Sequence, residues 1–486
     1  MGNYFSKKGG GGGGEKEKET VTKLRRRIEN PYVFTRTSSM FFDEDGDLAH
    51  EFYTEQRVEV KAGVVRWVMR KVSSAHLTPQ VKSLPLILNK TGGDFWYGII
   101  GKKHVGPDYV YPFPFSYTEE HYDLDQVGRN ITRMKEIVSE FFTLAKSKGK
   151  PFFLYIGIHD PHRGADQAQM QEYGQFLERW GDGSPGMGLI PDWTPTNYSP
   201  EDVKVPYFLP DTNATRSDLA ALYRTISRYD QGIGIFMQLL EDFGYDENTL
   251  VFLTSDNGIP FPNAKTNLYD PGMGEPLFIS NPLAKQRWNT TTQAMSSHTD
   301  MVPTVLDWFD LPVPSYTVNG HKVVLHGTSL LPVTVKEPTT GYDKAFSSHN
   351  LHAATMYYPM RVLRNKQYKL IHNLNYKMPY PMAQDIYFSP SFRDIVNRSI
   401  AGESLPWFKT LEEYYYRDQW ELFDLEKDPQ ELDNLAYDPT YDSILKPMQE
   451  ELYLWQKDTN DIWRCGPSGV LVYEADDSCY PLDNDT

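Results

Sequence analysis

Polar, protonatable side chains follow three apolar segments of this sequence at the point where each segment ends. In chain order they are Lys102 with His104, His159 with His162, and Asp256 with Asn257, and Lys265 lies shortly after the last pair. A carboxylate beside an amide oxygen suits a hard cation such as Ca²⁺ or Mg²⁺. Lysines and histidines suit the neutralisation and protonation of a tetrahedral oxyanion. The set therefore favours metal-assisted sulfuryl or phosphoryl transfer.

Each pattern also has a simpler interpretation. A strand followed by an Asn-Gly turn explains 254–258 without any ligand, and a surface turn explains Lys102, Lys103 and His104. A P-loop is excluded because no Gly-x₄-Gly-Lys-Ser/Thr aligns with the sequence. The chemical interpretation therefore depends on whether the three segments bring their ends together.

The elements that would position these side chains are strands of an α/β fold. The β-branched run in 249–255 predicts a buried parallel strand, and the apolar segments 94–101 and 151–158 are of the same type. Open α/β sheets bind ligands at the carboxyl edge of their strands. We therefore expect all three polar ends at one edge of the sheet.

Two long amphipathic helices are predicted to pack with this sheet. One spans 125–148 and ends at Gly149, and the other begins at Ser217 or Asp218 and ends at Gly244. After about residue 341 the pattern changes to alternating strands, typical of a smaller antiparallel α+β domain. The predicted division is residues 1–80, 81–340 and 341–486.

The charge distribution argues against nucleic acid as a partner. The chain of 486 residues has a net charge of −16, and residues 81–486 alone carry 35 Lys and Arg against 54 Asp and Glu. An acidic body repels phosphate backbones. An anionic substrate would therefore need a local cluster of cations.

Cysteine use and glycosylation motifs indicate a secretory-pathway protein. The only cysteines, Cys465 and Cys479, suit one disulfide-closed loop, although two free thiols would have the same spacing. Seven Asn-x-Ser/Thr motifs favour the oxidised form. The predicted glycosylation sites are Asn89, Asn130, Asn213, Asn289 and Asn397.

The first residues point to a different compartment. No secretory signal peptide is visible, while Met1–Ser6 fits the pattern for N-myristoylation at Gly2. Residues 7–30 are rich in glycine and basic side chains and are expected to be disordered. Such a tail could add a second signal for membrane contact; a solvated tail is the alternative. A genuine N-terminus of this kind would place the protein in the cytoplasm or at a mitochondrial or other membrane.

Two family resemblances divide the chain. Residues 1–80, most strongly 31–55, resemble the tumour suppressor candidate two family of small myristoylated proteins associated with mitochondria. Residues 82–486 resemble the sulfatase family. The sulfatase resemblance lies in Tyr97–His104, Thr254–Gly258, Asp300–Thr304 and Glu421–Glu431. Further stretches, including His159–Arg163 and Gly188–Pro195, are similar to the sulfamidase branch, which acts on the N-linked sulfate of glucosamine.

The sulfatase resemblance implies a fold, a substrate and residue roles. It implies an alkaline-phosphatase-like mixed sheet between helices, and heparan sulfate-derived oligosaccharide as the lysosomal substrate. Asp256 and Asn257 would hold one Ca²⁺, and Lys102 and Lys265 would bind sulfate oxygens. His104 and His162 would serve the hydrated formylglycine nucleophile and protonate the leaving amine. It also implies a Cys465–Cys479 disulfide and a homodimer.

One departure from the family pattern is chemically important. Sulfatases carry a Cys-x-Pro-x-Arg motif whose cysteine becomes formylglycine, together with paired aspartates on an early strand, and both should precede Ser83. The sequence contains neither there, and Cys465-Gly-Pro-Ser-Gly469 lacks the arginine. We therefore expect an incomplete calcium site and little or no sulfatase activity. The junction at 80/81 resembles a fused transcript or a gene-model artefact.

Three functions are consistent with these sequence features. The first is a sulfamidase-type hydrolase whose catalytic segment is missing from this sequence. The second is an inactive glycan-binding relative that keeps the cationic pocket. The third is a myristoylated, membrane-tethered fusion in which residues 1–80 direct the function. A phosphatase or phosphomutase is disfavoured by the two sulfatase-like stretches Tyr97–His104 and Glu421–Glu431.

Overall fold

The computed structural model describes most of the chain from residue 94 onward. Side chains are described for residues 94–105, 111–122, 125–164, 174–314, 325–352, 356–472 and 478–481. The predictions for residues 1–30, Gly2 and Asn89 lie outside the described residues. The chain forms two compact units, one of residues 1–81 with 105–110 and the other of the remaining residues.

In the first unit only the backbone of five strands is described. They are β1 (Phe41–Phe42), β2 (Leu48–Ala49), β3 (Tyr53–Lys61), β4 (Val64–Lys71) and β5 (Thr78–Pro79). Strands β2, β1 and β5 form one antiparallel sheet, and β3 pairs with β4 in a hairpin.

A three-stranded parallel sheet lies at the centre of the site-bearing half of the second unit. Strand β6 (Trp96–Gly101) pairs with β7 (Phe115–Thr118) on one side and with β8 (Phe152–Gly157) on the other. Five of the six residues of β6 are buried, as expected for an apolar strand with two neighbours. The strands predicted over 94–101 and 151–158 are thus confirmed.

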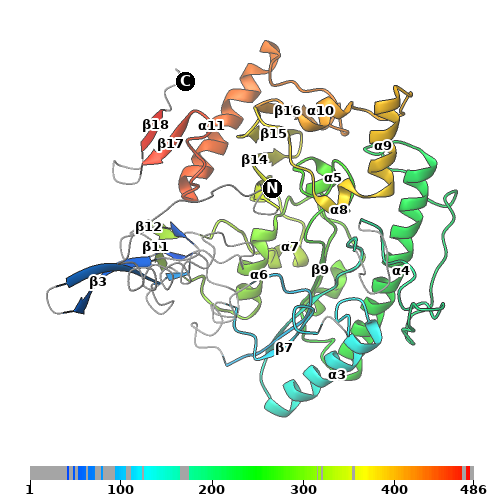
Figure 1. Ribbon diagram of the computed structural model, residues 1–486. Coiled ribbons are helices and arrows are strands. Elements are labelled where there is room, and N and C mark those ends of the chain that lie inside the picture. Colours follow the sequence, from blue (N-terminus) through cyan, green and yellow to red (C-terminus); the bar gives the residue numbers. More distant parts are fainter. Residues whose placement is uncertain are drawn as a thin grey trace, which may run out of the picture. The chain divides into compact units, whose positions relative to one another are not determined.

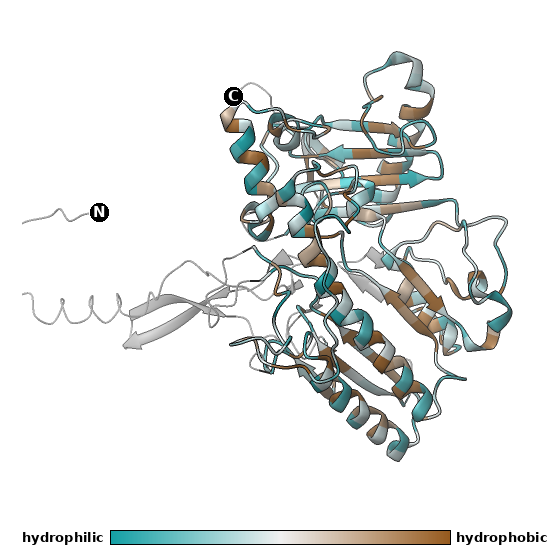
Figure 2. Cartoon of the chain, turned by 90° about the vertical axis from the view of Figure 1, so that its right-hand side faces the viewer, coloured by the Kyte–Doolittle hydropathy of each residue, from teal (hydrophilic) through white to brown (hydrophobic). Residues whose placement is uncertain are grey.

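Two helices pack together against this sheet. Helix α3 (Ile131–Lys148) and helix α4 (Asn213–Asp242) share an apolar cluster with β6 and β8 that includes Val138, Phe141 and Phe236. Figure 1 shows the two helices side by side. Their brown apolar residues and teal polar residues alternate along each helix in Figure 2, the pattern of an amphipathic helix.

Both predicted helix starts were wrong. Helix α3 starts at 131 and not at 125, because the Asn130 side chain caps it by accepting the Arg133 N–H. Helix α4 is capped by Thr212 and not by Ser217 or Asp218. The Asp218 carboxylate is buried and bound to an arginine, so it is unavailable to the helix end.

Strand β9 (Val251–Thr254) corrects the prediction of a buried parallel strand. It pairs antiparallel with β10 (Leu277–Ser280), and the two form a separate two-stranded sheet among the described residues. Leu253 is 37% exposed and Phe278 is 63% exposed. The apolar run predicted the strand correctly, but burial requires neighbours that the described residues do not provide.

Short elements connect this region to the C-terminal part. They are α5 (Asp270–Met273), η2 (Pro282–Arg287), η3 (His298–Asp300), α6 (Met301–Trp308), β11 (Tyr316–Val318), β12 (His321–Val323) and α7 (Leu331–Val335). None of the helices in the described part of the chain is both long and apolar enough to cross a membrane.

The C-terminal part contains the antiparallel sheet that the sequence predicted. Its strands, in spatial order, are β13 (Lys344–Leu351), β14 (Tyr357–Asn365), β15 (Tyr368–Asn373) and β16 (Trp420–Asp424). The other elements are α8 (Gln384–Tyr387), α9 (Pro390–Ala401), α10 (Leu411–Tyr415), η4 (Pro439–Tyr441), α11 (Asp442–Asp458), β17 (Gly469–Val472) and β18 (Ser478–Pro481). Helix α11 packs on β14 and β15 through Leu445, Met448 and Leu452.

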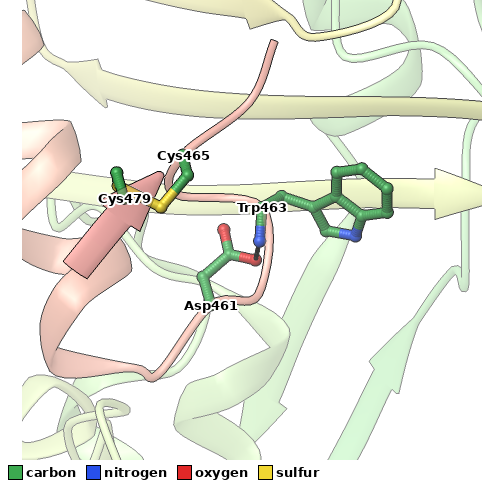
Figure 3. The surroundings of a disulfide bond; sticks show 4 residues. All are labelled: Asp461, Trp463, Cys465 and Cys479. Carbon is green, nitrogen blue, oxygen red and sulfur yellow. Dashed lines mark hydrogen bonds between the residues drawn. A yellow bond between two sulfur atoms is a disulfide. The ribbon is translucent and has the colours of Figure 1, made fainter. Parts of the chain in front are cut away.

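A disulfide closes the C-terminal hairpin region. Cys465 and Cys479 are bonded, and strand β17 lies between them in sequence and pairs with β18 (Figure 3). The Asp461 carboxylate accepts the Trp463 N–H at 3.1 Å and so shapes the turn that leads to Cys465.

Candidate functional site

Two glycines bring the ends of β6 and β8 close together. Gly101 is directly opposite Gly157, and its φ is +87°, a conformation that favours glycine. A Cβ on Gly101 would lie 2.0 Å from the Gly157 carbonyl oxygen. The Lys102 N–H instead donates to that oxygen at 2.8 Å. This close approach places the residues after both strands at one edge, as the sequence predicted.

Lys102 and Asp256 meet across this edge. The Lys102 Nζ lies 3.1 Å from Asp256 Oδ2, and the Asn257 amide donates to Asp256 Oδ1 at 2.6 Å. Lys102 and Asn257 outweigh the partial burial of the Asp256 carboxyl and hold its pKa below the ordinary value. Both oxygens of this predicted metal ligand are therefore already engaged by protein donors.

These residues do not fit a calcium ion. Ca²⁺ takes six to eight oxygen ligands, whereas Asp256 and Asn257 offer two side-chain groups, one of which is occupied by an ammonium. Within the described residues, no cluster of three or more His, Cys, Asp or Glu side chains could hold a metal ion. The positive charge beside Asp256 comes from Lys102.

A second lysine joins His162 to a carboxylate. The Lys265 Nζ lies 2.8 Å from Asp385 Oδ2 and 2.9 Å from His162 Nε2, and the lysine side chain is only 3% exposed. The other ring nitrogen of His162, Nδ1, contacts the Arg163 carbonyl oxygen. A carbonyl only accepts and an ammonium only donates, so the proton of His162 lies on Nδ1.

This tautomer limits what His162 can do. Burial and the charge of Lys265 lower the pKa of His162, so the ring is neutral at physiological pH. Nε2 carries no proton to give while it accepts from Lys265. In this arrangement the group able to donate a proton is the Lys265 ammonium. Burial lowers the pKa of Lys265, and the negative charge of Asp385 partly offsets that decrease.

His159 forms a separate acid–base pair with Glu119. The His159 Nδ1 lies 2.5 Å from Glu119 Oε2, and both side chains are mostly buried. Burial raises the pKa of Glu119 to about 7, whereas burial and the Arg129 charge lower the pKa of His159 to about 2. The pair can hold one proton on the carboxyl near neutral pH.

His104 is the predicted site residue with the least contact to the others. Its backbone N–H donates to Glu120 at 2.8 Å, and its φ is +47°. Its imidazole is exposed and forms no hydrogen bond with another described residue. The predicted role of His104 at a nucleophile stays a prediction.

Asp160, between the two histidines, and Arg163, directly after them, stabilise the loop that carries the histidines. Arg129 and Arg228 both bind the buried Asp160 carboxylate, at 3.1 and 2.6 Å. Arg163 forms a two-pronged pair with Asp218, with both contacts at 2.8 Å. These buried ion pairs fix the loop after β8 and so set the positions of His159 and His162.

Three carboxyl groups of the site were missed by reasoning from the sequence. Glu119 follows strand β7, so the rule that found the other strand ends could have found it. Asp385 lies in the first turn of the short helix α8, where the sequence gives no signal. Burial and the Asp256 charge raise the pKa of Glu275 to about 7, and no sequence pattern marks this residue.

The described glycosylation motifs differ in accessibility. Asn213, Asn289 and Asn397 are exposed, whereas Asn130 is half-buried and its side chain caps α3. Glycosylation, the homodimer and membrane contact stay predictions.

With the site in view, comparison with known proteins defines the class. A family model described as "Sulfatase" matches residues 65–311, and one described as "N-sulphoglucosamine sulphohydrolase, C-terminal" matches residues 386–458. The chain belongs to the sulfatase family. The α/β core with a C-terminal antiparallel sheet is therefore a sulfatase fold.

One relative indicates the branch of the sulfatase family to which the chain is similar. N-sulphoglucosamine sulphohydrolase of Homo sapiens is 50% identical over 408 residues, covering 84% of this chain and 80% of that protein. An ulvan-active sulfatase of Formosa agariphila is 27% identical over 336 residues, covering 64% of this chain and 52% of the other. The chain is thus a sulfamidase-like member of the family.

Solved structures and the N-terminal segment complete the comparison. A structure in complex with its substrate D-glucosamine-2-N,6-O-disulfate aligns with 79% of this chain and 83% of the other, with 19% identity and a TM-score of 0.47. The tumour suppressor candidate 2 family model matches residues 3–84, and the Mus musculus protein is 46% identical over 72 residues, which cover 15% of this chain and 64% of that protein.

Proposed function

We propose that this protein binds the N-sulfated glucosamine end of heparan sulfate-derived oligosaccharides in the lysosome and hydrolyses the N-linked sulfate slowly or not at all. The observation that carries the proposal is the 2.9 Å contact of Lys265 with His162, beside the Lys102–Asp256 pair whose lysine charge acts on both groups. Two lysine charges and a ring nitrogen suit a sulfate group linked to nitrogen. The sulfamidase-like relative supplies the substrate class.

Slow or absent turnover follows from chemistry that the residues do not supply. The sequence contains no Cys-x-Pro-x-Arg from which a formylglycine nucleophile could form. His162 has no proton on Nε2 to give to a departing amine. Asp256 and Asn257 alone do not hold a metal ion that could polarise the sulfate.

Both lysines are already paired with carboxylates, and binding would require only one of these ion pairs to open. Lys102 is paired with Asp256, and Lys265 with Asp385. The Asp256 side chain is 67% exposed, so Lys102 can leave it for a sulfate oxygen at low cost. Lys265 is buried and would keep Asp385 while offering its remaining N–H.

Calorimetric titration of the full chain with glucosamine N-sulfate tests recognition, with N-acetylglucosamine as the uncharged analogue. We expect the N-sulfated sugar to bind at least about tenfold more tightly, the value of one charge-assisted hydrogen bond. Lys102→Ala should remove about that factor, and Lys150→Ala, which removes an exposed lysine paired with Asp94, should not. Equal affinity for both sugars would overturn the proposed recognition.

Turnover is measured separately with a fluorogenic N-sulfoglucosaminide. We expect no fluorescence above that of a buffer blank over hours. Clear turnover by the purified chain would show that the site has a nucleophile and would overturn the proposed inactivity. Peptide mapping after release of N-glycans tests the lysosomal route, and Asn213, Asn289 and Asn397 are the expected modified positions because all are exposed.

A further inference from the structure

Lys265 is a buried cation held by residues from two distant parts of the sequence. Its ammonium contacts Asp385 Oδ2 at 2.8 Å, across 120 residues, and His162 Nε2 at 2.9 Å, across 103 residues. Asp385 belongs to α8 in the C-terminal part, whereas His162 follows β8. The predicted sulfate-binding lysine therefore depends on a carboxylate outside the sulfatase motifs.

The Asp385 carboxylate is itself fixed in place. Its Oδ1 accepts the Ile386 N–H at 3.0 Å, and its side chain is 8% exposed. Oδ2 is left to Lys265, and it lies 3.9 Å from His162 Nε2. One carboxylate thus sets the position of both the ammonium and the ring that accepts from it.

A lysine this deeply buried stays charged only with a nearby counter-charge. Without one, desolvation can lower the pKa of a buried lysine to about 5–6. The charged or titratable groups that act on Lys265 are Asp385 from α8, His162 after β8, Lys102 after β6, Asp256 after β9 and His352 after β13. Asp385 is the one carboxylate among them in direct contact with the ammonium.

We propose that Asp385 is a positioning residue for recognition of the N-linked sulfate: its carboxylate keeps Lys265 charged and aimed at the His162 side of the site. The inference rests on the proposed function and deepens it, because it assigns part of sulfate recognition to the C-terminal part of the chain. A carboxylate beside an anion site would otherwise only repel the ligand.

Asp385→Asn distinguishes this role from simple bracing of the fold. Loss of the carboxylate leaves Lys265 uncharged near neutral pH and charged in acid. Affinity for glucosamine N-sulfate should therefore be at least about tenfold below wild type at pH 7.5, the value of one lost charge-assisted hydrogen bond, and within about twofold at pH 5.5. Asp442→Asn, at an exposed carboxylate paired with Lys446 one turn away, is the matched control and should bind as wild type at both pH values.

A second variant isolates the charge of residue 265. Arginine stays protonated across this range, so Lys265→Arg combined with Asp385→Asn should remove the pH dependence of the loss. Melting temperatures at both pH values show whether each variant is folded. If Asp385→Asn alone does not fold, the double variant, which keeps a charge at position 265, still tests the role of that charge. A loss of the same size at both pH values in Asp385→Asn would overturn the inference alone. Failure of the wild-type chain to prefer the N-sulfated sugar would overturn the proposed function and the inference with it.

Discussion

Strands β8 and β9, whose ends carry part of the site, are built from apolar residues similar to those of the C-terminal sheet but are buried to a smaller extent. Strands β14 and β15 each have two hydrogen-bonded neighbours, and Val362 and Leu370 are fully buried. Strands β8 and β9 each have one neighbour among the described residues. Tyr155 on β8 is 46% exposed and Leu253 on β9 is 37% exposed.

The difference shows that strand sequence and strand burial are separate properties. Apolar side chains stabilise a fold only when neighbours remove them from water, at about 25 cal/mol per Å². The C-terminal sheet therefore holds its region by packing. At the site edge, buried ion pairs such as those of Asp160 and Asp218 fix the loop after β8, and Lys265 is paired with Asp385.

The largest expected effect compares leucine truncations in the two regions. Leu370→Ala in β15 should lower the free energy of unfolding by about 2–5 kcal/mol, because it opens a cavity in a closed core. Leu253→Ala in β9 should cost less than about 1 kcal/mol, because the side chain is already 37% exposed. Urea unfolding followed by circular dichroism measures both, and equal costs would contradict the comparison.

The next effect concerns the covalent link at the C-terminus. Replacing Cys465 and Cys479 together by serine should cost about 3 kcal/mol, the loop-entropy value for a sequence separation of 14. In this variant, hydrogen exchange should accelerate more in β17 and β18 than in α3, because the apolar cluster that contains α3 does not include the hairpin. Equal acceleration in α3 would mean that the two regions unfold as one.

Much of the architecture could be predicted because it depends on local patterns. Alternating and continuous apolar runs gave the strands at 94–101 and 151–158 and the antiparallel C-terminal strands. Gly149 was correctly expected to end α3, and it adopts a φ of +61°. The predicted start of α4 was wrong because Thr212 caps the helix by accepting the Thr215 N–H, while the Asp218 carboxylate inside the helix binds Arg163.

The site was predictable where residues follow strands and not where they approach from elsewhere. Strand ends brought Lys102 to Asp256 as expected. Asp385 contacts Lys265 although the two are 120 residues apart in sequence, and no periodic sequence pattern links residues so far apart. The antiparallel direction of β9 was also hidden, since a short apolar run has the same pattern in either direction.

A smaller, pH-dependent effect should distinguish the site edge from the C-terminal sheet. The pKa of Glu119 is raised to about 7, so this carboxyl stabilises the fold in acid and loses that contribution as pH rises through 7. The pKa of His159 is lowered to about 2, so the neutral ring stabilises the fold above 6.5 and less as pH falls. The two contributions oppose each other between about pH 4.5 and 6.5, where both groups bind protons differently in the folded and unfolded chain.

Glu119→Gln removes one side of this balance. The free energy of unfolding should then fall by about 1 kcal/mol between pH 6.5 and 5.5, because His159 alone resists protonation. The wild-type value should change much less over the same interval. Urea unfolding at both pH values measures the difference, with Glu136→Gln on the exposed face of α3 as the control. If the free energy of unfolding of the variant did not change between pH 6.5 and 5.5, His159 would be protonated as easily in the folded chain as in the unfolded chain.

The smallest expected effect lies at the most exposed apolar position of the open strands. Phe278 on β10 is 63% exposed, so Phe278→Lys should change the free energy of unfolding by less than about 0.5 kcal/mol. Ile279→Lys, the matched change at the neighbouring position, should lower the free energy of unfolding clearly more. Residue 279 is half-buried and pairs with Phe252, so the new charge would be partly removed from water. Light scattering should also show less self-association for Phe278→Lys, since a charge on an apolar edge opposes edge-to-edge pairing. A large loss of stability at Phe278 would mean that this face is covered in solution, and the contrast between the open strands and the closed C-terminal sheet would then fail.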